Sequence, residues 1–127
     1  MSREIKFRAW QKHHKKMIEV GAIQFPDPAV PDRPSFVVKR DSLETWTLDE
    51  VELMQFAGVK DRNGKDIYEG DILGLDDPTD QSRAFVVFHN GAFRQQLVRL
   101  PIFGDDWDWL VIGNIYENPG LVAKEES

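Results

Sequence analysis

The 127-residue chain contains no cysteine, few histidines and no long apolar run. Without cysteine it can form neither a disulfide nor a thiolate metal site, which fits a reducing compartment. The first residues, Met-Ser-Arg-Glu, do not begin an apolar signal segment. No apolar stretch approaches the roughly 18 residues of a membrane span. These absences predict a cytoplasmic protein.

Patterns that would hold a metal or perform catalysis are also missing. His13 and His14 are adjacent in a polar segment, and adjacent side chains of an extended chain point to different sides. Asp76, Asp77 and Asp80 suggest a calcium or magnesium site, but their spacing does not match an EF-hand loop and no glutamate closes the set. Neither a Ser/His/Asp order nor a phosphate-binding loop is present. We therefore expect no enzyme activity, no metal and no cofactor.

Charge is unevenly distributed along the chain. The formal net charge is −6, yet residues 1–16 contain six Lys/Arg and a single Glu. This basic segment is open to three interpretations: a solvated hairpin edge whose lysines oppose aggregation, a contact with the acidic face of a neighbouring subunit, or a nucleic-acid contact. The acidic remainder would repel a phosphate backbone. The nucleic-acid alternative would use Arg8, Lys12, Lys15 and Lys16.

The stretch from Met54 to Leu73 holds the densest structural signals. Asn63-Gly64 predicts a tight hairpin turn, because both residues tolerate positive φ. Asp61 precedes the turn and is placed to cap it with its side chain. The strand before the turn has apolar residues on both faces and should be largely covered. After the turn, Gly70 marks a bend or bulge where a small barrel strand begins.

The first 50 residues predict a hairpin and a loop. In residues 5–10, Ile5, Phe7 and Ala9 alternate with Lys6, Arg8 and Trp10, which predicts a half-buried strand. Residues 17–25 are predicted to be the returning strand, with a bulge at Gly21. Four prolines in residues 25–35 exclude a helix or a central strand, so this is an extended loop and a candidate binding arm. A short strand follows at 36–39. Ser42 begins a possible helical turn, and the strand before the central hairpin is expected to start at Thr47; no long helix is expected anywhere.

A second hairpin is predicted around Asn90-Gly91, between residues 83–88 and 92–100. We expect a polar outer face on its returning strand, made by Arg94, Gln95, Gln96 and Arg99. Residues 110–116 form the last strand. Because it is apolar on both faces, we expect it to be central or covered, with a bend at Gly113.

The segment Pro101 to Trp109 combines aromatic and acidic residues. Trp107 and Trp109 stand beside three aspartates, an unusual composition for a solvated loop. The rings either pack in the core or between subunits, or they contact a partner or a sugar, since aromatic residues are enriched at binding hot spots. The predicted partner-binding residues are Phe103, Trp107 and Trp109. Nothing in the sequence brings two carboxylates together as glycoside hydrolysis requires.

Three separated segments resemble the YopX family of small proteins encoded by phages and prophages. Gly58 to Leu73 (GVKDRNGKDIYEGDIL) looks like that family's signature. Ile5 to Trp10 (IKFRAW) with Lys15 to Met17 (KKM) is similar to its opening, and Val111 to Pro119 (VIGNIYENP) to its ending. Residues 25–46 carry no matching motif. The resemblance implies a mainly β fold, a phage origin and the cytoplasm of a host bacterium, without implying a reaction.

We therefore predict a mainly β protein in which an N-terminal hairpin region, residues 1–50, packs on a C-terminal SH3-like or barrel-like region, residues 51–127. The expected function is that of a non-enzymatic phage accessory protein, a protein-binding or assembly module. Its expected partners are its own copies, in a homo-oligomer, and a host or phage protein. The alternative is a nucleic-acid-binding module that uses the basic hairpin.

Overall fold

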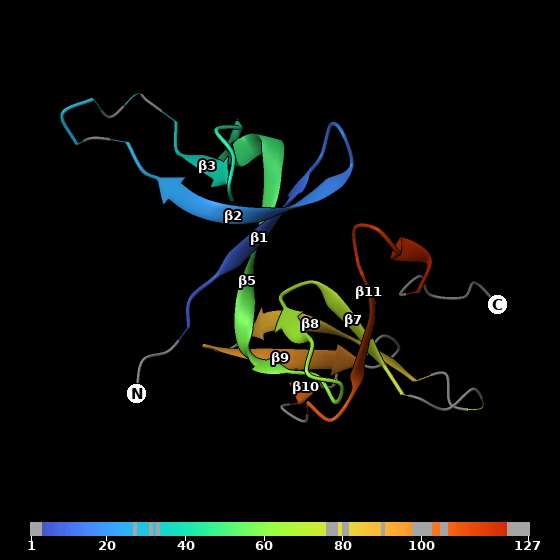
Figure 1. Cartoon of the computed structure of the whole chain (residues 1–127). Helices are drawn as coiled ribbons and strands as arrows, with labels where there is room; N and C mark the ends of the chain where they lie inside the picture. Colours follow the sequence, from blue (N-terminus) through green and yellow to red (C-terminus); the bar gives the residue numbers. More distant parts are fainter. Residues whose placement is uncertain are drawn as a thin grey trace. The chain divides into compact units, whose positions relative to one another are not determined.

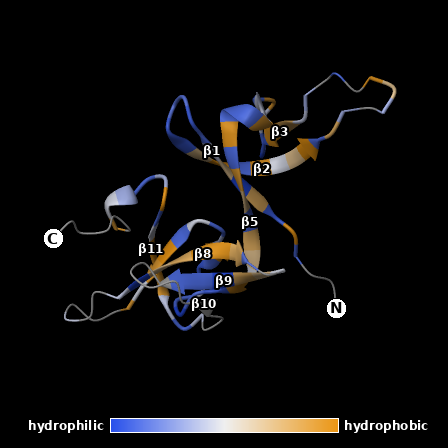
Figure 2. Ribbon diagram, turned by 180° about the vertical axis from the view of Figure 1, so that it is seen from behind, coloured by the Kyte–Doolittle hydropathy of each residue, from blue (hydrophilic) through white to orange (hydrophobic). Residues whose placement is uncertain are grey.

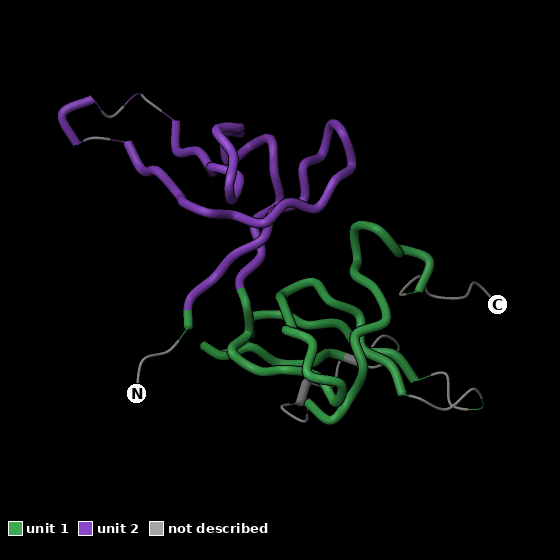
Figure 3. The backbone as a smooth tube through the Cα atoms, viewed as in Figure 1, with its two compact units in different colours: residues 1–4, 56–127 green, residues 5–55 purple. Residues whose placement is uncertain are grey.

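The chain is mainly β, as predicted. The computed structural model describes residues 4–26, 28–30, 32, 34–75, 79, 82–89, 91–97, 103–104 and 107–121. This part contains eleven β-strands and two short 3-10 helices (Figure 1). None of its helices is long and apolar enough to cross a membrane. The chain forms two compact units, one of residues 5–55 and one of residues 1–4 and 56–127, called here unit 2 and unit 1 (Figure 3).

Unit 2 is an antiparallel sheet built from consecutive hairpins. Its strand order is β4-β3-β2-β1-β5, and β5 continues into unit 1, where it pairs with β6. The predicted N-terminal hairpin is confirmed, with Gln11 opposite Lys16 across a four-residue turn. The bulge at Gly21 is also confirmed, because the β2–β3 register shifts between Val20 and Ala22. The strands are β1 (Phe7–Gln11), β2 (Lys16–Gln24), β3 (Phe36–Lys39), β4 (Thr45–Thr47) and β5 (Val51–Lys60).

Strand alternation in unit 2 produces one apolar core face. Ala9 is completely buried, and the neighbouring Arg8 and Trp10 lie on the opposite face of β1, as predicted. The half-buried Trp46 packs against the core from β4. The buried core residues are Ala9, Ile18, Val37 and Val51.

The helical turn forms later in the chain than predicted. The Ser42 hydroxyl oxygen accepts the Glu44 N–H at 3.1 Å in a local turn, and no helix begins there. The 3-10 helix η1 (Leu48–Glu50) instead interrupts the predicted strand. The Thr47 N–H donates to the Glu50 carboxylate at 2.9 Å, which closes this helical turn. The strand therefore starts at Val51.

Unit 1 is a second antiparallel sheet with strand order β10-β9-β8-β7-β11, beside the β5–β6 hairpin. Both Asn-Gly hairpins are confirmed, with φ of 84° at Gly64 and 80° at Gly91. The SH3-like arrangement of these strands stays a prediction. The elements are β6 (Asp66–Tyr68), β7 (Asp71–Gly74), β8 (Arg83–His89), β9 (Ala92–Leu97), β10 (Phe103–Gly104), β11 (Leu110–Asn114) and the 3-10 helix η2 (Pro119–Leu121).

The core of unit 1 gathers side chains from most of its strands. Trp109, just before β11, is 9% exposed and belongs to this core. Phe93 and Trp107 are partly buried and pack against it. The buried core residues are Ala57, Ile67, Leu73, Ala84, Val86 and Trp109.

One prediction about unit 1 is wrong, and another holds in part. The last strand is predicted to be central or covered: β11 lies at the edge of the described sheet, so it is not central, but all of its residues except Ile112, which is 38% exposed at a bulge, are partly or fully buried. Gln95 does not belong to a polar outer face: it lies opposite Val86 on the core side and is 8% exposed. Arg94 and its neighbour Gln96 do lie on the other face. Arg99 falls outside the described residues.

The boundary between the two units falls inside a strand. The predicted division after residue 50 and the division at Gln55/Phe56 both fall at or within β5. The first half of β5 pairs with β1 in unit 2, and the second half pairs with β6 in unit 1.

Candidate functional site

The Asp61 side chain connects the central hairpin to a distant strand. Its Oδ1 accepts the backbone N–H groups of Asn63 at 2.9 Å and Lys65 at 2.8 Å, which confirms the predicted turn cap. Its Oδ2 accepts the Val111 N–H at 2.9 Å, from a residue fifty positions away. The β5–β6 turn is thereby fastened to β11, and one edge N–H of that strand is satisfied. We call these four residues the Asp61 clamp.

Hydrogen bonding sets the ionisation of Asp61. Burial alone would raise its pKa. The N–H groups of Val111, Lys65 and Asn63, helped by the positive charge of Lys65, outweigh burial and hold the Asp61 pKa below its ordinary value. The carboxylate is therefore stabilised as an anion, and both of its oxygens accept hydrogen bonds from backbone N–H groups.

A second link beside the Asp61 clamp positions the tryptophan segment. The Arg62 N–H donates to the Trp109 carbonyl at 3.0 Å, and the Arg62 side chain contacts Asp108 through Nε at 3.0 Å. The Asp108 side chain is 72% exposed, so this ion pair contributes little stability by itself. The backbone bond holds Trp109 where its ring enters the core.

The predicted partner-binding residues therefore have different surroundings. Trp109 is a core residue, and Trp107 is only partly buried against the same core. Phe103 lies in β10 opposite Gln96; its side chain is outside the described part. The packing alternative accounts for Trp109. Partner binding by the other two stays a prediction.

Residues 111–119, which resemble the family's ending, contain side chains that hydrogen-bond to the backbone of a turn. The Asn114 side-chain oxygen accepts the N–H groups of Tyr116 at 3.0 Å and Glu117 at 2.8 Å, and its amide donates to the Glu117 carboxylate. Asn118 Oδ1 accepts the Asn114 N–H at 3.2 Å. A Cβ on Gly113 would lie 2.5 Å from that oxygen, which explains the glycine. These polar side chains shape a turn after β11.

The basic residues of the nucleic-acid alternative are partly engaged by acidic neighbours. Lys12 Nζ lies 3.2 Å from Glu52 and donates to the Asp49 carbonyl at 3.2 Å. Arg8 is half-buried in β1, whereas Lys15 and Lys16 are exposed at the hairpin turn. Residues 5–55 contain eight Lys/Arg and eight Asp/Glu, so unit 2 has no net formal charge. The basic segment is thus balanced within its own unit.

The candidate metal ligands are only partly within the described residues. His13 and His14 are exposed and pack edge to face, with ring centroids 4.8 Å apart. Asp76, Asp77 and Asp80 lie outside the described residues. Among the residues that are described, no three His, Cys, Asp or Glu side chains are grouped to hold a metal ion.

Exposed apolar side chains are the features that sequence reasoning missed. In unit 2, Phe25 is 65% exposed, Leu43 is 95% exposed and Leu48 is 36% exposed. In unit 1, Phe88 is 58% exposed at the end of β8. Single apolar residues in strands normally predict burial, so only the register and the strand ends identify these as surface residues.

The comparisons with known proteins agree with the fold. The structure is similar to that of protein EF1440 from Enterococcus faecalis, with 28% sequence identity and a TM-score of 0.64. The match covers 96% of this chain and 100% of the EF1440 chain. The structure is also similar to protein yopX from Bacillus subtilis, with 18% identity and a TM-score of 0.55 over 95% of this chain and 98% of that one. No curated protein matches the sequence. The YopX protein family model matches residues 6–123, nearly the whole sequence, and the chain therefore belongs to the YopX family.

Proposed function

We propose that this protein is a phage- or prophage-encoded accessory protein that acts by binding protein chains, its own copies included, without catalysing a reaction. The observation that carries the proposal is the exposure of large apolar side chains around the proline loop of unit 2. Exposed apolar groups that gather at one place mark interaction surfaces. The polar side chains of the family-like segments, by contrast, are engaged in turns and caps.

The strand register brings two of these side chains to one end of the sheet. Gln24, Phe36 and Thr47 form a row across β2, β3 and β4. Continued by one residue beyond the strand ends, this register would place Phe25, Ser35 and Leu48 in the next row, and the Leu48 N–H does donate to the Ser35 carbonyl at 3.1 Å. Since neighbouring strands lie about 4.8 Å apart, Phe25 and Leu48 flank Ser35 at roughly 10 Å from each other.

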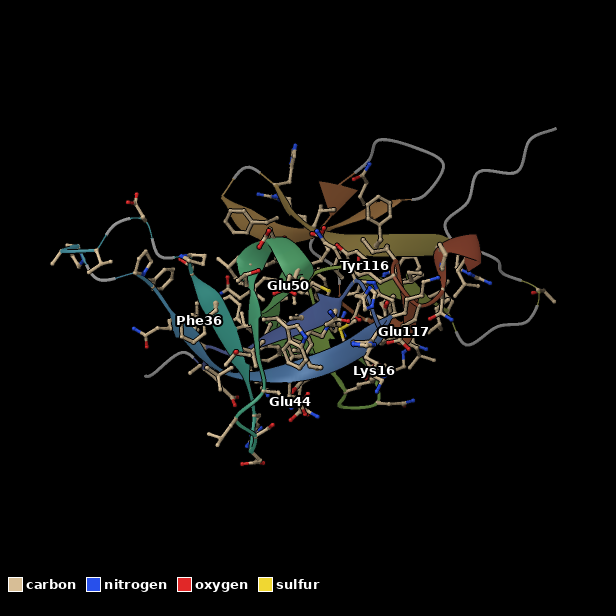
Figure 4. All side chains as sticks on the ribbon, turned by 90° about the horizontal axis from the view of Figure 1, so that it is seen from above. Lys16, Phe36, Glu44, Glu50, Tyr116 and Glu117 are labelled. Atoms are coloured by element: carbon tan, nitrogen blue, oxygen red, sulfur yellow. The ribbon has the colours of Figure 1, made fainter. Side chains whose placement is uncertain are left out.

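The proline loop adds a third apolar residue. Val30 is 42% exposed, and Figure 2 shows a hydrophobic segment in the described part of the loop. We call Phe25, Val30 and Leu48 the proline-loop surface. Leu43 belongs to the other end of the sheet: it lies in the β3–β4 turn next to Glu44, whereas Phe36 begins β3 (Figure 4).

The charge of unit 2 does not oppose a second copy at this surface. Unit 2 carries as many acidic as basic residues, so two such units approach without net repulsion. Direct pairing of strand edges is less favourable, because the Thr47 N–H at the outer strand β4 already donates to Glu50. Side-chain packing through the proline-loop surface is therefore the proposed contact.

Light scattering after size exclusion tests this proposal. We expect an oligomeric mass for the unmodified protein and for Leu43→Ser, which removes an equally apolar residue at the other end of the sheet. The measured mass of the double variant Phe25→Ser/Leu48→Ser should shift toward that of the monomer. A monomeric mass of the unmodified protein at micromolar concentration would overturn self-association.

Nucleic-acid binding is the second candidate, and the exposure of Lys15 and Lys16 at the β1–β2 turn favours it. It predicts a mass increase with DNA or RNA at low salt, which weakens as salt rises. Changing Arg8, Lys12, Lys15 and Lys16 together should abolish that increase. No mass change at low salt would remove this candidate and leave protein binding.

A further inference from the structure

We infer that unit 1 carries a separate binding surface, at the Phe88–Phe93 pair of the β8–β9 hairpin, that accepts a tryptophan side chain of another protein. This surface is independent of the proline-loop surface. It would stand unchanged if the protein were a monomer in solution.

The first observation is a pair of facing phenylalanines, Phe88 and Phe93, at the solvent-exposed end of the core face. We call this cross-strand pair a rung. Phe88 follows Ala84 and Val86 on the core face of β8, yet it is 58% exposed. It lies opposite Phe93, and the two rings meet edge to face with centroids 5.1 Å apart. Phe93 packs against the core. A planar apolar group could therefore extend an existing stack of side chains.

The second observation is an unused hydrogen-bond acceptor one rung further in. Gln95 lies opposite Val86 and is 8% exposed, and its Oε1 is buried with no hydrogen-bond partner among the residues that the structure describes. A buried acceptor without a donor destabilises the fold. The side chain has several rotatable bonds, so a small rotation toward the Phe88–Phe93 rung would present Oε1 to an incoming N–H group.

These two observations select the chemistry of the ligand. The surface offers aromatic rings and one acceptor, so the best match is a flat apolar group with a single donor. The tryptophan indole is a donor only. A tyrosine hydroxyl or a backbone amide would bring an acceptor of its own that also needs a partner.

We infer that the tryptophan comes from a different protein, because each tryptophan of this chain is partly or fully buried within its own unit. Trp109 is in the core of unit 1, and Trp107 packs against that core. Trp46 packs against the core of unit 2. Trp10 is half-buried in β1 and has an interaction of its own. A second copy could therefore present a whole indole ring only by giving up packing within its own units.

An NMR titration of the isotopically labelled full chain with two small probes tests the inference. Indole has the ring N–H, whereas 1-methylindole keeps the ring and lacks the donor. We expect indole to shift the backbone signals of Phe88, Phe93 and Gln95 and to bind about fivefold more tightly than 1-methylindole, the equivalent of one neutral hydrogen bond.

Two variants separate the acceptor from the rings. Gln95→Met keeps the volume and removes the unpaired oxygen, so it should raise the melting temperature and make the two probes bind equally well. Phe88→Ser should weaken the binding of both probes to the same extent. Ile112→Ser, at another exposed apolar site of unit 1, should leave the binding of both probes unchanged. Equal binding of the two probes to the unmodified protein, or signal shifts away from the β8–β9 hairpin, would overturn the inference.

Discussion

Asp61 shows how a single residue can be predicted in part. Its place two residues before Asn63-Gly64 predicts the turn cap, because an aspartate side chain reaches the backbone N–H groups just after it. Its bond to Val111 was beyond prediction, since nothing local relates residues fifty positions apart. The same limit applies to Gln95, whose type suggests a surface and whose register places it inside.

Asp61→Asn should destabilise the protein by about 1–3 kcal/mol at neutral pH. The amide keeps an oxygen for Asn63 and Lys65 but turns an NH₂ group toward the Val111 N–H, which loses its acceptor. Urea unfolding measures the loss. Glu44→Gln is the control, because the Glu44 side chain is 61% exposed and 3.8 Å from Lys39, so its removal should cost less than about 0.5 kcal/mol.

The same variant should change the pH dependence of stability. The pKa of Asp61 is lower in the folded chain than in the unfolded chain. Its contribution is therefore full above the unfolded value of about 3.9 and is lost as pH falls through the lower folded value. The difference in unfolding free energy between Asp61→Asn and the unmodified protein should therefore shrink as the pH falls from about 3.9 through the folded pKa. A constant difference from pH 7 to pH 2 would contradict this assignment.

Gly113→Ala should cost about 1–2 kcal/mol, because the new methyl group displaces the Asn118 side chain and breaks its bond to the Asn114 N–H. Gly120→Ala is the matched control. No atom lies within 4 Å of its added Cβ, so it should be neutral or slightly stabilising. Thermal unfolding of the two variants side by side distinguishes crowding from a general effect of replacing glycine.

Strands and turns were the elements that could be read best from the sequence. Both Asn-Gly turns and the alternation of β1 are local signals, and each matches its observed element. The position of β11 could not be read, since a strand with apolar residues on both faces looks the same at an edge as at a centre. The 3-10 helix η1 was missed because the Thr47–Glu50 pair resembles the start of a strand until the side chains are placed.

The two hairpin turns should respond alike to substitution. Gly64→Ala and Gly91→Ala each force an L-residue to a φ near +80°, and neither new Cβ meets another atom. Only backbone strain remains, so each should cost about 1–2 kcal/mol. Chemical denaturation of both variants measures this cost. A much larger loss at one turn would mean that this turn contributes more than its backbone conformation.

For the whole molecule, the fold class could be predicted from the sequence, but the identity of the exposed apolar side chains could not. The family-like segments predicted the mainly β architecture, and their side chains prove to hold that architecture together, as the Asp61 clamp does. Trp109 lies in a segment of unusual composition and is buried. Phe25 and Phe88 look like ordinary strand residues in the sequence, yet both are exposed. Exposure depends on where a sheet ends, and the sequence does not encode that locally.

Self-association should make stability depend on concentration. If the proline-loop surface joins copies, mass action favours the folded assembly, and the melting temperature should rise as the protein concentration increases. The variant Phe25→Ser/Leu48→Ser should melt at the same temperature at every concentration, while Leu43→Ser keeps the dependence. A flat response of the unmodified protein would argue against a contact at this surface.

The reach of the Asp61 clamp also sets an order of events during synthesis. Every strand partner within unit 2 lies among the first 55 residues, so its pairings need no residue that is made after Gln55. Unit 1 must wait for Val111 before Asp61 is fully engaged and for β11 before β7 has its second neighbour. Such long separations slow folding. We therefore expect these distant contacts of unit 1 to form after the hairpins of unit 2.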